Sequence, residues 1–295
     1  MANEAGFIGL GAMGMAISAN LVAAGTKLCV YNRTAAKAAP LVAKGAVQAR
    51  TAGEAAVPGG IVFTMLSDDS AVRSVTEGDN GLAARLAPGG IHVSMSTISP
   101  ATARELARYH AERGSIYLAS PVFGRPENAE KKQLVVCVSG AGAAKERVRP
   151  MHEAIGRAIY DFGETPDAAN VAKLAGNFLI GAAIESMAEA FTMAEKSGVD
   201  RLKLAQMLTQ TLFASPVFQN YGSMVAEKRH LPAGFKLPLG LKDFDLVLTT
   251  ASEARVPMPI AGLVKNRLLA ALAKGREELD WSGLALGVLD EAGIK

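Results

Sequence analysis

The sequence has few of the residues on which several protein classes depend. It contains two cysteines, four histidines, one tryptophan and 5% aromatic residues, and its net charge is +3 over 295 residues. Cys29 and Cys137 cannot form the disulfide framework of a small secreted protein, and no Cys or His stands at zinc-ligand spacing. Lysine and arginine are spread along the chain, so nothing resembles a nucleic-acid-binding arm or a polybasic membrane anchor. We therefore expect no metal site and no nucleic-acid partner.

Signals for export or membrane insertion are also scarce. The first residues, MANEAGFIGLGAMG, enter a folded pattern directly, without the basic and apolar regions of a signal peptide. The most apolar long stretch, residues 168–194, is a poor membrane span because polar and charged residues interrupt it. Because 49% of its 295 residues are apolar, the chain can form a large hydrophobic core. We expect a cytoplasmic protein that is not bound to a membrane.

The first part of the chain alternates apolar runs of strand length with helical patterns. Runs that are apolar on both faces are typical of parallel strands buried by helices. This alternation predicts an α/β fold with a Rossmann-type, doubly wound sheet over residues 1–164. A helix over 101–113 is expected to open at Pro100. The predicted strands are residues 6–10, 27–32, 61–66, 91–94, 117–119, 134–139 and 158–162.

Residues 165–295 show almost no strand pattern and predict an all-α domain. Residues 167–197 lack proline and predict one long helix that joins the two domains. This helix is apolar nearly all round, so both of its sides need cover, and a homodimer or higher oligomer is the simplest expectation. A loop is expected over 231–240. Shorter helices are expected at about 201–213, 216–226, 240–254, 260–273 and 282–291.

A glycine-rich motif follows the first predicted strand and opens the next helix. It reads Gly9-Leu10-Gly11-Ala12-Met13-Gly14, the GxGxxG pattern of dinucleotide-binding turns. Gly9 permits the tight turn, Gly11 lets a pyrophosphate approach the backbone, and Gly14 permits close packing of helix on strand. The free N–H groups at the helix start would hold the phosphates. The alternative is a glycine-rich turn that holds no ligand.

The end of the second predicted strand, Asn32-Arg33-Thr34, indicates which dinucleotide binds. An acidic residue here would bind a ribose 2′-hydroxyl, whereas an arginine suits a 2′-phosphate. The sequence has Arg33, a neighbouring hydroxyl on Thr34 and no acidic residue at these positions. This favours NADP(H) over NAD(H), and the alternative is that Arg33 is a solvated surface residue.

Two polar residues on the long helix are candidates for chemistry. Lys173 and Asn177 are four residues apart and share one helix face. Apolar neighbours should partly desolvate the lysine and lower its pKa, so that it can protonate a carbonyl oxygen while Asn177 orients that oxygen. The alternative is a lysine that snorkels to the surface. Lys242 and Asp243 are expected to begin a helix, and a helix cap or surface pair explains them without a function.

Together these segments resemble the β-hydroxyacid dehydrogenase family, which includes 3-hydroxyisobutyrate dehydrogenases and glyoxylate/succinic-semialdehyde reductases. FIGLGAMG, NRT, FTMLSDDSAV, MSTISP, the Lys173–Asn177 segment, LKD and PMP (257–259) carry the resemblance, in the family's order and spacing. The resemblance implies that Lys173 is the catalytic lysine and Asn177 its partner. It also implies that the cofactor contacts Met65, Leu66, Ser67, Thr97 and Lys242, and that Asp243 belongs to the substrate site beside Thr97 and Asn177.

The sequence departs from this family at the expected substrate loop. Where family members commonly carry Ser-Gly-Gly, this chain has Phe123-Gly124-Arg125. Phe123 and Gly124 would therefore line the pocket of a small-molecule substrate larger or more apolar than a simple hydroxyacid, while Arg125 either holds an anion or faces water. An imine reductase on the same scaffold is the alternative function, although such enzymes commonly replace the lysine. A non-catalytic cofactor-binding module is a third reading, which Lys173 beside Asn177 argues against.

Overall fold

The computed structural model describes residues 4–294 and divides the chain into two compact units. The first unit comprises Met1–Lys173 and the second Leu174–Lys295. The division falls within one long helix, α8 (Ala168–Lys196), a little beyond the domain boundary proposed from the sequence at residues 164 and 165. Each unit is described separately.

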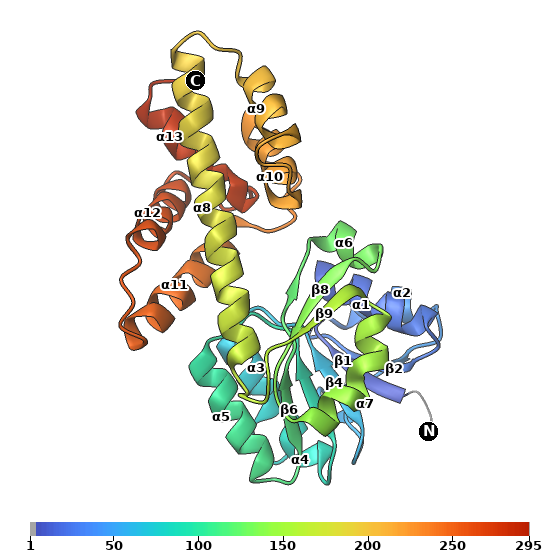
Figure 1. Ribbon diagram of the computed structural model, residues 1–295. Coiled ribbons are helices and arrows are strands. Elements are labelled where there is room, and N and C mark those ends of the chain that lie inside the picture. The colour runs from blue at the N-terminus through green and yellow to red at the C-terminus, as the bar shows by residue number, and fades with distance from the viewer. Residues whose placement is uncertain (1–3, 295) are drawn as a thin grey trace. The chain divides into compact units, whose positions relative to one another are not determined.

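A six-stranded parallel sheet forms the centre of the first unit (Figure 1). Its strand order is β3-β2-β1-β4-β5-β6, so the order reverses beside β1, where open α/β sheets bind their ligands. The expected doubly wound architecture is confirmed. The strands are β1 (Glu4–Ile8), β2 (Lys27–Tyr31), β3 (Val47–Gln48), β4 (Ile61–Thr64), β5 (Ile91–Ser94) and β6 (Ile116–Ala119).

Helices cover both faces of this sheet because successive strand residues point to opposite sides. Phe7 and Phe63 pack with Ile17 of α1 on one face, and Ile8 packs with Leu82 of α4 on the other. Helix α5 begins at Pro100, as predicted, and the Ser99 side chain caps it. The helices of this unit before α8 are α1 (Ala12–Ala23), α2 (Ala39–Val42), α3 (Asp69–Thr76), α4 (Leu82–Leu86), α5 (Pro100–Ala111), α6 (Pro126–Glu130) and α7 (Gly142–Glu153), with 3₁₀ helices η1 (Ala35–Ala38) and η2 (Gly53–Ala55).

The last two predicted strands of the first unit form a sheet of their own, which corrects the expectation of one continuous sheet. Strand β8 (Leu134–Val138) pairs antiparallel with β7 (Val122–Phe123) and parallel with β9 (Gly156–Asp161). Pro121 follows the end of β6 and has no N–H to donate, so the ladder of the large sheet cannot continue there. A single antiparallel bridge, Ala119 with Ser139, joins the ends of β6 and β8.

The second unit is helical, as predicted. Helix α11 begins at Leu237 rather than at about residue 240, because Pro238 fits the first helical turn and does not prolong the loop. Gly181 on α8 leaves room for the ring of Phe244, since a Cβ there would lie 2.5 Å from that ring. The remaining elements are α9 (Arg201–Gln210), α10 (Pro216–Ala226), α11 (Leu237–Glu253), α12 (Pro259–Ala273), η3 (Trp281–Leu284) and α13 (Ala285–Glu291).

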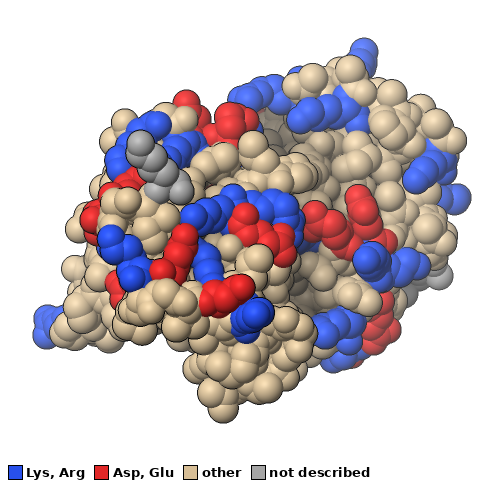
Figure 2. All heavy atoms as spheres, turned by 90° about the horizontal axis from the view of Figure 1, so that it is seen from above, with Lys and Arg blue, Asp and Glu red and all other residues tan. Residues whose placement is uncertain are grey.

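Helix α8 is long and apolar enough to cross a membrane by length and composition alone, and no other helix within residues 4–294 passes that test. Core helices of soluble proteins pass it too, and α8 contributes Ile184, Ala188 and Phe191 to the hydrophobic core of the second unit. On the face drawn in Figure 2, basic and acidic side chains are interspersed and do not separate into patches of one sign.

Candidate active site

The glycine-rich turn lies between the carboxyl end of β1 and the start of α1. The surroundings of its three glycines differ. Gly9 has a φ of +99°, and a Cβ on it would lie 2.2 Å from the carbonyl oxygen of Met65. A Cβ on Gly14 would lie 1.9 Å from the carbonyl oxygen of Gly9. The fold itself therefore requires these two glycines. A Cβ on Gly11, in contrast, would meet no described atom within 4 Å.

The open space beside Gly11 fits the diphosphate of a dinucleotide. Gly11 is the N-cap of α1, and no described side chain caps the helix or places an acidic group in its first turn. The N–H groups of Ala12, Met13 and Gly14 thus lie where an anion is stabilised by backbone donors and by the helix dipole. A Cβ at residue 11 would fill the cradle, so the residues present fit a bound dinucleotide.

Asn32 holds the glycine-rich turn in place. Its Oδ1 accepts a hydrogen bond from the Leu10 N–H at 2.9 Å, and its Nδ2 donates to the carbonyl of Thr34 at 3.0 Å. The side chain proposed to contact the cofactor is thus engaged with the protein backbone, joining the end of β2 to the turn. Arg33 and Thr34 lie beside it with exposed side chains.

The segment after β4 is anchored to the segment after β5. The Leu66 N–H donates to Ser96 Oγ at 2.8 Å, while Met65 and Leu66 are half-buried and Ser67 is exposed. Thr97 is half-buried directly after Ser96. These positions place the predicted cofactor contacts at the carboxyl ends of neighbouring strands, the edge at which such sheets bind ligands.

Sequence reasoning missed the residue that fixes this edge. Asp69 Oδ1 accepts from the Ser99 N–H at 3.0 Å, and its Oδ2 accepts from Thr102 Oγ1 at 2.8 Å and from the Ser99 hydroxyl. The carboxylate ties the start of α3 to the start of α5. The signal available in the sequence is the pair of capping segments SDDS and STISP, which mark two helix starts but not their contact.

Lys173 on α8 lies against Phe123 of the expected substrate loop. The Lys173 Nζ is 4.1 Å from the centre of the Phe123 ring, within the range of a cation–π interaction. Both side chains are half-buried. The nearby Cys137 is buried, which raises the pKa of its thiol, and the positive charge of Lys173 acts in the opposite direction. The lysine is thus held against an aromatic ring and does not extend freely from the helix.

Gly124 and Arg125 shape the rest of this loop. Gly124 has a φ of +138°, and a Cβ on it would lie 2.6 Å from the Leu134 side chain. Arg125 has a side chain only 16% exposed, so it does not face open water, and its Nε lies 3.7 Å from Glu127 Oε2. Its N–H donates to Asn128 Oδ1 at 2.9 Å at the start of α6.

In the second unit, Asn177, Lys242 and Asp243 form one cluster. Asn177 Nδ2 donates to Asp243 Oδ2 at 2.6 Å, and Lys242 Nζ lies 2.9 Å from Asp243 Oδ1. Asn177 and Asp243 are buried. The expectation that Lys242 and Asp243 begin a helix is wrong, because both lie inside α11. A helix cap or a surface pair therefore does not explain them. Asp243 fixes the orientation of the Asn177 amide.

Five of the predicted residues thus fall in two sets, and α8 carries a member of each. Lys173 lies with Phe123 in the first unit, and Asn177 lies with Lys242 and Asp243 in the second. The two helix residues are one turn apart on a continuous helix. This arrangement offers a cation next to an apolar wall, and a buried amide whose oxygen and orientation are set by a carboxylate.

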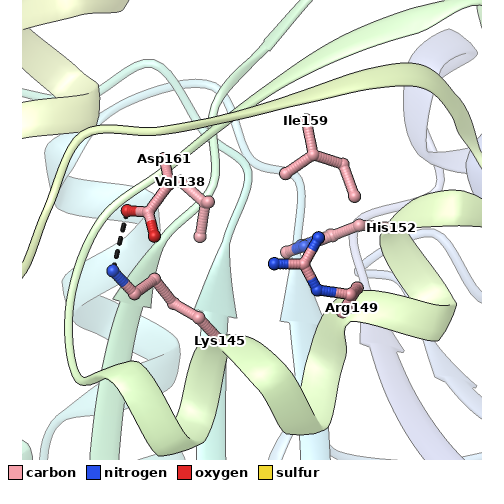
Figure 3. A pocket seen from close by; sticks show the side chains of 6 residues that line it. All are labelled: Val138, Lys145, Arg149, His152, Ile159 and Asp161. Carbon is pink, nitrogen blue, oxygen red and sulfur yellow. Dashed lines mark hydrogen bonds and ion pairs between the residues drawn. The ribbon is translucent and has the colours of Figure 1, made fainter.

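A small cavity in the first unit lies outside these sets (Figure 3). It has a volume of about 40 Å³, which holds a few water molecules at most and not a dinucleotide. Lys145 and Asp161 on its wall pair with each other at 2.7 Å. Burial lowers the pKa of His152 beside them to about 4, so this histidine is neutral near pH 7. We assign this cavity no part in the chemistry.

Comparisons with known proteins show the family to which the chain is similar. Residues 4–163 match the family model described as the NAD binding domain of 6-phosphogluconate dehydrogenase. Residues 167–286 match the model described as NAD-binding of NADP-dependent 3-hydroxyisobutyrate dehydrogenase. An oxidoreductase of Bacillus subtilis (strain 168), YfjR, is 44% identical over 277 residues, which are 94% of this chain and 96% of that protein.

Solved structures show the same likeness. The 3-hydroxyisobutyrate dehydrogenase of Salmonella typhimurium matches with a TM-score of 0.85 at 28% identity, covering 96% of this chain and 99% of that one. An imine reductase of Streptomyces aurantiacus matches with a TM-score of 0.66 at 25% identity, covering 95% and 98%. The sequence and the fold support the dehydrogenase reading better than the imine alternative. The chain belongs to the β-hydroxyacid dehydrogenase family of NAD(P)-dependent oxidoreductases.

Proposed function

We propose that this enzyme transfers a hydride between NADP(H) and a carbonyl or hydroxy substrate, with Lys173 as the general acid or base. The observation that carries the proposal is the position of the Lys173 ammonium against the Phe123 ring. Hydride addition to a carbonyl builds negative charge on the oxygen, and a partly desolvated ammonium neutralises that charge as it forms. The nicotinamide supplies the hydride when it is bound.

Asn177 has a supporting role in this proposal. The carboxylate of Asp243 accepts from Asn177 Nδ2, which fixes the amide plane. An amide fixed in this way can hold the substrate oxygen in the direction of the lysine one turn away on α8. Lys242 pairs with the same carboxylate, so its position depends on the same anchor.

The preference for NADP(H) rests on the end of β2. The exposed Arg33 and Thr34 follow the strand, and no carboxylate stands at residues 32–34 to repel a 2′-phosphate or to bind a ribose hydroxyl. A guanidinium forms charge-assisted, forked hydrogen bonds with phosphate oxygens. These features support NADP(H).

Imine reduction is the second candidate function, and Phe123 is the residue that favours it. Phe123 replaces a hydroxyl-bearing turn and offers an aromatic wall that suits an apolar amine-derived substrate. Lys173 argues against it, since a protonated iminium gains nothing from a second cation nearby. Turnover of a cyclic imine compared with that of an aldehyde such as succinic semialdehyde separates the two.

The experiment that tests the proposed function is a screen of NADPH oxidation over small aldehydes, keto acids and cyclic imines. We expect turnover of at least one aldehyde or keto acid above that of every imine. Turnover of imines alone would replace the proposal with its alternative.

We further propose that the enzyme is a homodimer or a higher homo-oligomer. Leu179 and Met193 on α8 are large, apolar and exposed, and surface side chains of this kind along one helix support a subunit contact. Light scattering at micromolar concentration tests this, and a monomeric mass would contradict it.

A further inference from the structure

Asn170 lies in the first turn of α8, and hydrogen bonds locate that turn at the edge of the large sheet. The N–H of Ala169 donates to Ser139 Oγ at 3.0 Å. Ser139 in turn exchanges two backbone hydrogen bonds, of 3.0 and 3.1 Å, with Ala119, the last residue of β6. Ala169 also packs in one apolar cluster with Ile98 and Ala119. The start of α8 therefore lies at the carboxyl end of β6.

This position belongs to the half of the sheet away from Arg33. Strand β2, which ends beside Arg33, lies on one side of β1, whereas β4, β5 and β6 lie on the other. A dinucleotide whose phosphates lie at the start of α1 has its two nucleosides on opposite sides of that point. With the phosphate-bearing ribose at β2, the nicotinamide falls on the side of β5 and β6.

The side chain of Asn170 is buried without a partner. It is 1% exposed, and neither Oδ1 nor Nδ2 makes a hydrogen bond within residues 4–294. Asn177, two turns along the same helix, is also buried, but its Nδ2 donates to Asp243. Buried amides are almost always paired, so an amide with both of its polar atoms unpaired indicates a missing partner.

The two unpaired atoms restrict the chemistry of that partner. Nδ2 needs an acceptor and Oδ1 needs a donor. A substrate carboxylate only accepts, so it would leave Oδ1 of Asn170 unpaired. A primary carboxamide carries one acceptor and one donor side by side and satisfies both atoms of an asparagine at once.

We propose that Asn170 binds the carboxamide of the nicotinamide, with Nδ2 donating to the carboxamide oxygen and Oδ1 accepting from its NH2. This inference rests on the proposed function, since it requires a nicotinamide cofactor. Asn170 and Lys173 are three residues apart and share one face of α8. The pair would set the plane of the ring relative to the proton donor, so that the hydride-bearing carbon faces the carbonyl that Lys173 protonates.

The test compares two dinucleotides that differ only at the carboxamide. NADP+ or NAD+, whichever binds the protein more tightly, is titrated by calorimetry beside its 3-acetylpyridine analogue, in which a methyl group replaces the NH2. We expect the unmodified protein to bind the natural dinucleotide about five- to ten-fold more tightly, the usual effect of one buried hydrogen bond. In Asn170→Leu, which keeps the size and removes both polar atoms, the two affinities should agree within about two-fold.

A matched control separates this effect from a general change in α8. Thr192 is also on α8, is 4% exposed and has an unpaired hydroxyl, but it lies about six turns further along. Thr192→Val should keep the full preference for the natural dinucleotide. Asn170→Ala serves as the second variant if Asn170→Leu does not fold, as judged by circular dichroism.

Each outcome decides the matter. Equal binding of the two dinucleotides by the unmodified protein overturns the assignment of Asn170, and so does a variant of Asn170 that retains the preference. Failure of the unmodified protein to bind either dinucleotide overturns the proposed function itself and is thereby distinguished from failure of the assignment.

Discussion

The ammonium of Lys173 lies 4.1 Å from the centre of the Phe123 ring. The face of the ring attracts the cation and excludes water from one side of it. Phe123, which departs from the family's substrate loop, and Lys173, the proposed proton donor, are therefore in direct contact. Changes at Phe123 should alter both the choice of substrate and the environment of the lysine.

Substrate choice is predicted to change in Phe123→Ser. A buried polar group of a substrate needs a partner, which serine offers and phenylalanine does not. We expect the ratio of kcat/KM for a small carboxylate-bearing aldehyde to that for a bulky apolar one to rise about ten-fold or more, equivalent to about 1.4 kcal/mol. Phe123→Leu, which keeps the pocket apolar, should leave this ratio near its original value. An unchanged ratio in Phe123→Ser would place the ring outside the pocket.

Cofactor preference is predicted to reside in Arg33. The unmodified protein should bind NADPH at least about ten-fold more tightly than NADH, because of a charge-assisted contact with the 2′-phosphate. Arg33→Asp should reverse the order, since a carboxylate repels the phosphate and binds the ribose hydroxyls of NADH. Titration of both cofactors against both proteins measures this. Equal affinities in the unmodified protein would exclude the role of Arg33.

The local sequence was sufficient to predict the nucleotide-binding sheet and its glycine-rich turn. Continuous apolar runs and regularly spaced glycines are local signals, because each determines the structure of only a few neighbouring residues. The strand before Gly9 and the start of α1 could therefore be predicted from them. The separate sheet of β7, β8 and β9 could not be predicted in this way. The sequence of an apolar strand does not specify which other strand it pairs with. The loss of an N–H at Pro121 was the available signal.

The sequence identified candidate site residues but not the contacts between them. The helical spacing placed Lys173 and Asn177 on one face, which is a property of the backbone. The contact of Lys173 with Phe123 and that of Asn177 with Asp243 join residues far apart in the chain. Asp69 and Asn170 were missed because an acidic residue at a helix start, or an asparagine in an apolar helix, has a common structural explanation.

The protein should lose stability at pH values well above those at which carboxylates usually titrate. All four histidines are buried, and burial lowers the pKa of His110 to about 3, of His152 and His230 to about 4, and of His92 well below 6.5. Below pH 6.5 the unfolded chain takes up protons that the folded chain does not, so stability is lost as the pH falls from about 6.5 toward 4.

The magnitude of this loss can be measured separately in the two units. Each histidine should lower the free energy of unfolding by about 1.4 kcal/mol per pH unit in this range. His92, His110 and His152 lie in the first unit and His230 in the second, so a probe of the first unit should register the larger loss. Urea unfolding at pH 7 and pH 5.5 tests this. A free energy of unfolding that is constant between these values would contradict it.

Asp243 is predicted to support both stability and catalysis. Asp243→Ala would leave the amide of Asn177 buried without its acceptor, which costs about 1–3 kcal/mol of stability. We expect kcat to fall about ten-fold or more, because the amide that orients the substrate oxygen loses its anchor. Asp245, two residues further along α11, pairs with Lys265 in a more exposed position and provides the control. Asp245→Ala should change stability by less than about 1 kcal/mol and leave kcat unaltered.

The central claim is that Lys173 transfers the proton, and one measurement tests it most directly. The rate of carbonyl reduction is compared between the unmodified protein and Lys173→Met, with Lys196→Met, an exposed lysine on the same helix, as the control. We predict a decrease in kcat of about 10²–10⁴ in Lys173→Met, no decrease in the control and an NADPH affinity within about two-fold in all three proteins. Near-full activity of Lys173→Met on its best substrate would contradict the account and leave imine reduction as the better one.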